Sequence, residues 1–166
     1  MKLSSIPVFL FPIALCLVAA TSPLAAGVDR PALRIQTLDG RMFDLAAERG
    51  RWVIVNFWAT WCSPCIKEMP ALSAFVSSHA NVTAIGLDYE ETGRAEVEAF
   101  LKKHPVSYPV AQVDTAKPPV DFATPRGLPT TYLIAPDGHV AKRFIGPVTA
   151  DDLETVIGAR TPPAGT

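Results

Sequence analysis

The sequence is poor in the side chains that bind metal ions and nucleic acids. It has 3 cysteines and 3 histidines among 166 residues, and 15 lysine and arginine side chains against 16 aspartates and glutamates leave a net charge of −1. A near-neutral chain without a long run of basic residues offers little to a phosphate backbone. We therefore expect no nucleic-acid partner. The sequence also lacks internal repeats and any sign of a second domain.

The first 26 residues differ in composition from the rest of the chain. Lys2 is followed by an apolar run over 6–20 and then by Ser-Pro-Leu-Ala-Ala, which ends at Ala26. A basic start, a short apolar run and small residues at the end are typical of a secretory signal peptide. This pattern predicts a signal peptide over 1–26, with cleavage after Ala26 or, as the alternative, after Ala20.

An uncleaved N-terminal membrane anchor is the second interpretation of this segment. The apolar run is shorter than the ~20 residues that a membrane-spanning helix needs, so we favour the cleaved signal. The prediction is then one domain over 27–160 and a disordered tail over 161–166, in a protein that is soluble after cleavage. Its expected location is the periplasm or another site outside the cytoplasm, and a monomer is the simplest expectation for its assembly.

The apolar patterns of the remaining chain alternate between those of strands and those of helices. Continuous apolar runs indicate strands buried on both faces of a sheet, and a strand–helix–strand succession indicates a right-handed parallel unit. The predicted elements are a hairpin over 31–50, strands over 52–59 and 81–90, helices over 63–79 and 92–103, a short strand over 108–113, a hairpin over 129–146 and a last helix after 149. We expect an α/β fold from this order.

Cys62 and Cys65 would be the only thiols after removal of the signal segment, which contains Cys16. A purely structural disulfide between them is a poor use of two cysteines. Closing a loop of four residues stabilises a fold by ~2 kcal/mol, against ~4.7 kcal/mol for a loop of a hundred residues.

A metal site is the second interpretation of the pair, because two thiolates suit Cu(I) or Zn(II). Structural zinc takes four protein ligands, and the histidines available lack ligand spacing to each other or to the cysteines. They are His79, His104 and His139. We assign no metal ligand and no cofactor, and a copper-binding chaperone that uses the same two sulfurs stays as the alternative function.

A redox pair is the third interpretation, and the position of the cysteines favours it. At the start of a helix, residues three apart lie on one face, close enough for small shifts to allow a disulfide. Cys62 would lie in the N-cap region, where free N–H groups and the helix dipole favour a thiolate. Cys62 is then the attacking sulfur, and Cys65 is the resolving one.

A buried strand that ends in "FWATWCSPC", followed by a helix and later by "GLPTTYLI", resembles the thioredoxin superfamily. "WCSPCIKEMP" together with "GLPTTYLIAPDGHV" is similar to its exported TlpA/ResA branch, the DsbE-like thiol–disulfide oxidoreductases. The resemblance covers about residues 30–158. It implies a thioredoxin-like fold, in which helices flank a central mixed β-sheet, with an N-terminal β-hairpin and a strand and helix inserted at the centre, here near 92–103.

The resemblance also implies roles for residues around the cysteines. Pro129 matches a proline that is cis in the family and lies against the cysteine pair. Leu128 would then face Cys62 and pair its backbone with a client peptide, as in strand addition. Trp61 would be an exposed apolar contact for the client.

The residue at position 56 departs from ordinary thioredoxins, which carry an acid there to move the proton of the resolving cysteine. Asn56 cannot act as a base. Glu68, three residues after Cys65, is the expected replacement, because the TlpA/ResA branch is similar in placing glutamate there. A partly desolvated carboxylate could accept and return this proton.

The function predicted is therefore that of a thiol–disulfide oxidoreductase acting as a protein-disulfide reductase outside the cytoplasm. Its partners would be exported client proteins that bear disulfides, of the cytochrome c maturation or copper-site assembly type, and a membrane-embedded electron donor. A strongly oxidising pair needs an unusually stable thiolate, and Ser63-Pro64 adds only one hydroxyl donor, which favours the reducing direction. A peroxidase of the peroxiredoxin type is disfavoured, because Cys62 follows Trp58-Ala59-Thr60-Trp61 and not a Pro-x-x-x-Thr-x-x pattern.

Overall fold

The computed structural model describes residues 28–160. The predicted signal peptide and the predicted tail lie outside these residues. The elements follow the chain in this order: β1 (Arg34–Gln36), β2 (Met42–Asp44), the 3-10 helix η1 (Leu45–Glu48), β3 (Trp52–Trp58), α1 (Ser63–Ser78), β4 (Val82–Asp88), α2 (Arg94–Lys103), β5 (Val110–Gln112), β6 (Thr130–Ile134), β7 (Val140–Ile145) and α3 (Ala150–Arg160).

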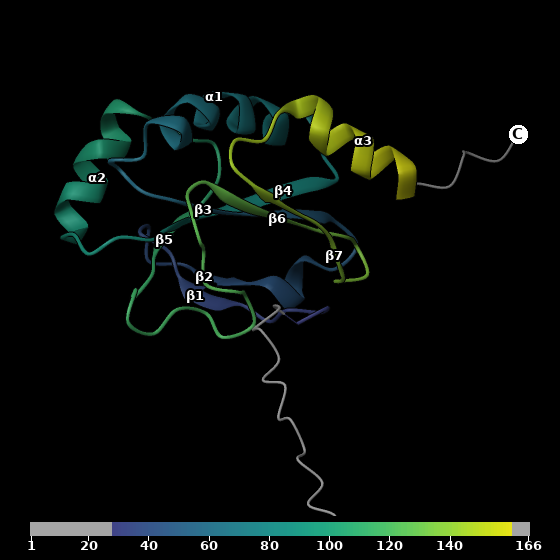
Figure 1. Cartoon of the computed structure of the whole chain (residues 1–166), viewed down its shortest axis with the longest axis horizontal. Helices are drawn as coiled ribbons and strands as arrows, with labels where there is room; N and C mark the ends of the chain where they lie inside the picture. The colour runs from purple at the N-terminus through teal and green to yellow at the C-terminus, as the bar shows by residue number, and fades with distance from the viewer. Residues whose placement is uncertain (1–27, 161–166) are drawn as a thin grey trace, which may run out of the picture.

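Five of the strands form a mixed sheet in the order β5-β4-β3-β6-β7 (Figure 1). β3 is the central strand, parallel to β4 and antiparallel to β6. All seven of its residues are buried, which explains its continuous apolar run. The prediction of an α/β fold with a mixed sheet is confirmed.

The two faces of the sheet carry separate apolar cores, because successive side chains of a strand point to opposite faces. Ile54 and Trp58 of β3 join a core with Met69, Leu72 and Phe75 of α1. On the other face, side chains of β3 pack with the N-terminal hairpin, η1 and the loop before β6; they include Val53, Val55, Phe57, Phe43, Leu45 and Phe122.

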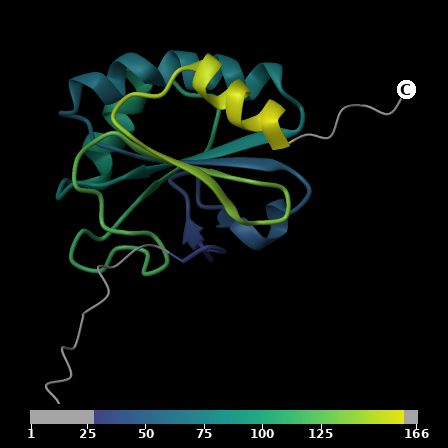
Figure 2. The same ribbon diagram turned by 45° about the vertical axis from the view of Figure 1, so that its right-hand side comes forward.

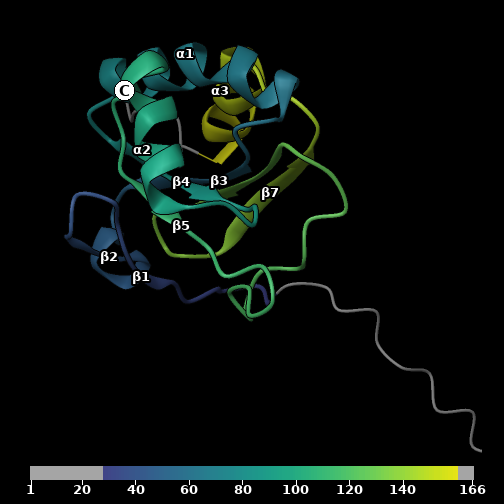
Figure 3. The same ribbon diagram turned by 90° about the vertical axis from the view of Figure 1, so that its left-hand side faces the viewer.

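The views from three sides agree on a layered arrangement. α1 and α3 run over one face of the sheet, and α2 lies near the α1 end of the same layer (Figures 1 and 2). The β1–β2 hairpin lies on the opposite face (Figure 3). Within residues 28–160, no helix has both the length and the apolarity that a membrane crossing requires.

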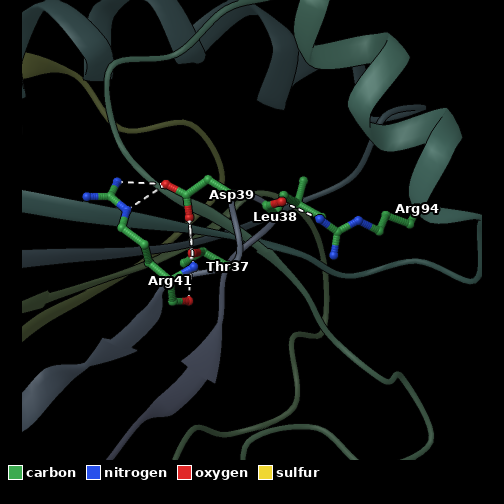
Figure 4. Close-up of polar contacts among 5 residues, drawn as sticks. All are labelled: Thr37, Leu38, Asp39, Arg41 and Arg94. Atoms are coloured by element: carbon green, nitrogen blue, oxygen red, sulfur yellow. Dashed lines mark hydrogen bonds and ion pairs between the residues drawn. The ribbon is translucent and has the colours of Figure 1, made fainter.

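The N-terminal hairpin turns at Asp39-Gly40, as predicted, with Gly40 at a φ of 85° that favours glycine. Polar contacts hold this turn (Figure 4): Asp39 accepts hydrogen bonds from Thr37 and Arg41. Arg94, the first residue of α2, donates to the carbonyl of Leu38. The hairpin is thereby connected to α2.

The last helix begins with the capping box that the sequence predicts. Asp152 accepts from the backbone N–H of Thr149 at 2.9 Å, and the Thr149 hydroxyl accepts from the N–H of Asp152 at 3.2 Å. These bonds satisfy free N–H groups at the start of α3. α3 packs against α1.

Candidate active site

One edge of the sheet collects the residues that the sequence analysis selects. β3 and β4 are parallel, so their carboxyl ends meet there, with Trp58 opposite Asp88. β6 is antiparallel to β3, so it starts at that edge, where Thr130 pairs with Phe57. The loop after β3, Pro129 before β6 and the segment after β4 are therefore neighbours in space although they are far apart in the sequence.

The cysteines lie in this edge at the start of α1. Cys62 is the N-cap residue, and its sulfur accepts a hydrogen bond from the N–H of Cys65 at 3.3 Å. The two form a disulfide, with their Cα atoms 5.3 Å apart. Cys65 is fully buried and Cys62 is 3% exposed. The helix N-terminus favours negative charge on Cys62, so the arrangement is suited to thiol–disulfide exchange.

The expected client-binding residues have contrasting environments. Trp61 is 68% exposed, beside the nearly buried Cys62. The peptide bond between Leu128 and Pro129 is cis. Leu128 packs against the core cluster that contains both cysteines, and the carbonyl of Pro129 accepts a hydrogen bond from the N–H of Gly146 at 2.9 Å.

Glu68 is a buried carboxylate on the inner side of α1, where it is 5% exposed. Its Oε1 accepts from the side-chain amide of Asn56 at 2.9 Å, and its Oε2 accepts from the N–H of Val148 at 2.9 Å. Burial raises the pKa of Glu68, and the hydrogen bonds from Val148 and Asn56 oppose that rise. Such a group can exchange a proton closer to neutral pH than an exposed glutamate can.

Trp58 and Tyr108 form a closely packed part of the core, and Tyr108 is near enough to Glu68 to respond to its charge. Burial, followed by the charge of Glu68, raises the pKa of Tyr108, which is 6% exposed. Trp58 and Tyr108 both pack against Gly86, where a Cβ atom would lie 3.0 Å from the Trp58 indole nitrogen and 3.2 Å from the Tyr108 ring. Glycine at position 86 allows this close approach.

The histidines have structural partners away from the cysteines. His79 and His104 cap α1 and α2 and stack on Phe75 and Phe100, with ring centroids 4.1 Å and 4.4 Å apart. His139 hydrogen bonds to Asp29 and Arg30. In the part of the chain that the structure describes, no three side chains among histidine, cysteine, aspartate and glutamate are grouped so as to hold a metal ion.

Three neighbours of the site are not evident from the sequence. The backbone of Val148 is 80 positions from Glu68, and no side-chain pattern identifies it. Asp88 is fully buried at the end of β4, and Glu90 accepts from the N–H of Thr60 at 2.7 Å. An acid at the end of an apolar strand is the only signal that could have identified Asp88.

Known proteins resemble this chain in sequence and in structure. The model of the AhpC/TSA family matches residues 26–143. The thiol-disulfide oxidoreductase ResA of Bacillus cereus is 35% identical over 138 residues, which cover 82% of this chain and 79% of the relative. ResA of Bacillus subtilis is 32% identical over 135 residues, with 79% and 73% of the two chains covered.

Among solved structures, a DsbF homologue from Corynebacterium diphtheriae superimposes with a TM-score of 0.69 at 24% identity. The match covers 80% of this chain and 87% of that one, and it shows the shared fold. The family match, the ResA relatives and the paired cysteines at the start of α1 agree with one another. The chain belongs to the AhpC/TSA family of thioredoxin-like proteins and, within it, to the ResA-like thiol–disulfide oxidoreductases.

Proposed function

We propose that this oxidoreductase reduces disulfides of exported client proteins through Cys62 and Cys65. The Cys62 thiolate attacks a client disulfide, forms a mixed disulfide and releases one client sulfur as a thiolate. The Cys65 thiolate then attacks Cys62, releasing the second client sulfur and leaving the Cys62–Cys65 disulfide. Two electrons pass to the client, which takes up two protons. The observation that carries the proposal is the position of Cys62 at the N-cap, with Cys65 one turn further along α1.

The second step needs removal of a proton from the Cys65 thiol, and we assign that role to Glu68. Its buried position keeps the pKa of its carboxyl above the usual value, so that it can accept a proton and return it. Asn56 donates to Glu68 and to the Thr131 hydroxyl, each at 2.9 Å, and is a positioning residue in this scheme.

The client would bind along the exposed rim beside Cys62. Trp61 offers an apolar surface, and the backbone of Leu128, before the cis Pro129, can pair with an extended client segment. A client held this way places its disulfide against the N-terminus of α1. A site that recognises clients through backbone pairing and one aromatic contact would accept clients with many different sequences.

The direction of electron flow is part of the proposal. A dithiol loses electrons readily when its thiolate is only moderately stabilised, and Ser63-Pro64 adds one hydroxyl donor between the cysteines. We infer a reductase of the periplasm, produced with a cleaved signal over 1–26 and reduced by a membrane-embedded donor. Clients of the cytochrome c maturation or copper-site assembly type fit this setting. An equilibrium titration that placed the potential near those of strongly oxidising exported proteins would contradict this direction.

A Cys65→Ser variant, expressed in the native compartment, is expected to accumulate as a mixed disulfide with its client. Without the resolving thiol, the complex formed through Cys62 cannot be released. Non-reducing electrophoresis detects the complex, and mass spectrometry identifies the partner. The double variant Cys62→Ser, Cys65→Ser is the control and should trap nothing. If Cys65→Ser captures no protein and instead only loses bound Cu(I), the copper-binding chaperone is the correct function.

A Trp61→Ala variant is expected to bind clients about tenfold more weakly while it reacts normally with a small disulfide. Loss of an exposed aromatic contact of this kind costs roughly 1–2 kcal/mol of binding free energy. The KM for a protein client should rise with little change in kcat, and the rate with a small disulfide should stay as in the unmodified protein. Equal losses with both substrates would instead indicate damage to the cysteine pair.

A further inference from the structure

A second buried carboxyl group lies at the edge of the sheet that holds the cysteines. Asp88 ends β4 and is 0% exposed. Within residues 28–160, no donor is within hydrogen-bond geometry of either of its carboxyl oxygens. Gln112, the neighbour on β5, donates its amide to the carbonyl of Thr92 at 2.8 Å. An ionised carboxylate in this position would be buried without compensation.

Protonation of Asp88 avoids the cost of burying that charge. Burial, followed by the charge of Glu90, raises the pKa of Asp88 to about 8, against a smaller lowering by the side-chain amide of Gln112. Asp88 is therefore expected to be uncharged at neutral pH. An uncharged Asp88 also avoids repulsion from the neighbouring charge of Glu90.

Glu90 in turn holds the loop that leads to the cysteines. Its Oε1 accepts from the N–H of Thr60 at 2.7 Å, two residues before Cys62. The N–H of Tyr89 donates to the carbonyl of Trp58 at 2.8 Å, so the segment after β4 is bonded to the loop at two places. The loop closes on itself where the N–H of Cys62 donates to the carbonyl of Ala59 at 3.1 Å.

We propose that Asp88, together with Glu90, positions the loop 59–62 and makes the potential of the cysteine pair depend on the charge of Asp88. Both are positioning residues. This inference rests on the proposed use of Cys62 as the attacking thiolate. It names residues that act on the cysteines through the loop and through charge, without contact with the client.

Glu90 is the main charged neighbour of Asp88. β3 presents Trp58, β5 presents Gln112, and α2 packs Phe100 against the Trp58 ring with centroids 5.6 Å apart. α1 contributes the buried Glu68, whose charge acts on Tyr108 in the same core layer. Among the described residues, no cation contributes to the pKa of Asp88. Glu91, the next acid along, accepts from the Thr115 hydroxyl at 3.1 Å.

The sign of the coupling follows from the charges. In the oxidised protein the sulfurs are neutral, and Asp88 loses its proton near pH 8. In the reduced protein a Cys62 thiolate adds negative charge, so Asp88 holds its proton to higher pH. The reduced form thus binds more protons than the oxidised form above about pH 8. In that range the reduction potential of the cysteine pair should fall more steeply with pH than it would if only the two cysteines titrated.

The test is an equilibrium titration of the full-length protein against glutathione at a series of pH values on both sides of pH 8. The unmodified protein should become more reducing above that pH. The equilibrium constant should change on the order of tenfold for each unit by which the pKa of Asp88 differs between the oxidised and reduced proteins. Asp88→Asn has nearly the same size but cannot ionise, and should lack the steeper portion of the curve. Glu91→Gln is the matched control and should follow the unmodified protein.

Glu90→Gln provides a second, independent measurement. It keeps an oxygen that can accept from Thr60 but removes the charge that raises the pKa of Asp88, so the steeper portion should begin at lower pH. An unchanged curve in Asp88→Asn, or its loss in Glu91→Gln, would overturn the inference. If the potentials show no role for Asp88 while Cys65→Ser still traps a client, this inference fails and the proposed function stands.

Discussion

Glu68→Gln is expected to slow the reduction of a client disulfide by about a hundredfold at neutral pH. Proton transfer by a positioned side chain contributes roughly 10²–10⁴ to a rate, and glutamine cannot accept the proton of Cys65. The loss should fall on the second step, the release of the client. The mixed disulfide should therefore accumulate in the variant, although both cysteines are present. Rapid-quench experiments with a protein client identified by the Cys65→Ser variant can measure the formation and the resolution of the mixed disulfide separately.

The pH dependence separates a chemical role of Glu68 from a structural one. The pKa of Glu68 is raised, so the unmodified protein should lose resolving activity as pH falls through that pKa and the carboxylate becomes protonated. Glu68→Gln should lack this acidic limb. Glu154→Gln, on the exposed face of α3, is a matched control and should behave as the unmodified protein does. If Glu68→Gln carries out both steps at the rates of the unmodified protein, another group moves the proton.

Asp88→Asn is expected to stabilise the fold by about 2–4 kcal/mol at pH 7. The folded protein keeps a proton on Asp88 up to about pH 8, whereas the unfolded chain releases it near its ordinary pKa of 3.8. The folded state therefore binds more protons between these values, and the free energy of unfolding falls with rising pH by at most ~1.4 kcal/mol per pH unit. Asparagine is neutral in both states and removes this loss.

The experiment is urea unfolding of both proteins at a series of pH values. The stability difference should be small at pH 4 and should grow until about pH 8, where it becomes constant. Asp151→Asn, in the exposed first turn of α3, is the control, and its effect on stability should be small. A constant difference across the range for Asp88→Asn would mean that packing, not ionisation, explains the effect. A stabilised variant with altered redox behaviour would indicate that stability has been given up for function.

Much of the fold follows from short-range patterns in the sequence. The apolar run of β3 is long and uninterrupted because that strand is central and covered on both faces. The Asp39-Gly40 turn and the capping box at Thr149 are local, and the structure has both. Most predicted boundaries lie within two residues of the observed ones; the predicted strand over 108–113, for example, is reduced to Val110–Gln112 at the sheet edge, where it pairs only with β4. The hairpin predicted over 31–50 is shorter: β2 ends at Asp44, and Leu45–Glu48 forms a 3-10 helix that the sequence analysis did not predict.

The residues of the site also differ in how far the sequence alone could identify them. The spacing of Cys62 and Cys65 and their place before a helix are properties of consecutive residues, so the sequence was sufficient to predict the redox pair. The contacts of Glu68 were not predictable in this way: it bonds to Asn56 on β3 and to the backbone of Val148, 12 and 80 positions away. A backbone N–H carries no residue-specific signal.

Asp88 shows the difference most clearly. In the sequence it is one of 16 acidic residues, at the end of an apolar strand, and an exposed carboxylate there would be ordinary. Its raised pKa arises because β3 and β5 pair on both sides of β4 and the loop 59–62 is bonded to Glu90 beside it, which removes it from water. Desolvation depends on what packs around a group, and that is settled only when strands distant in the chain come together.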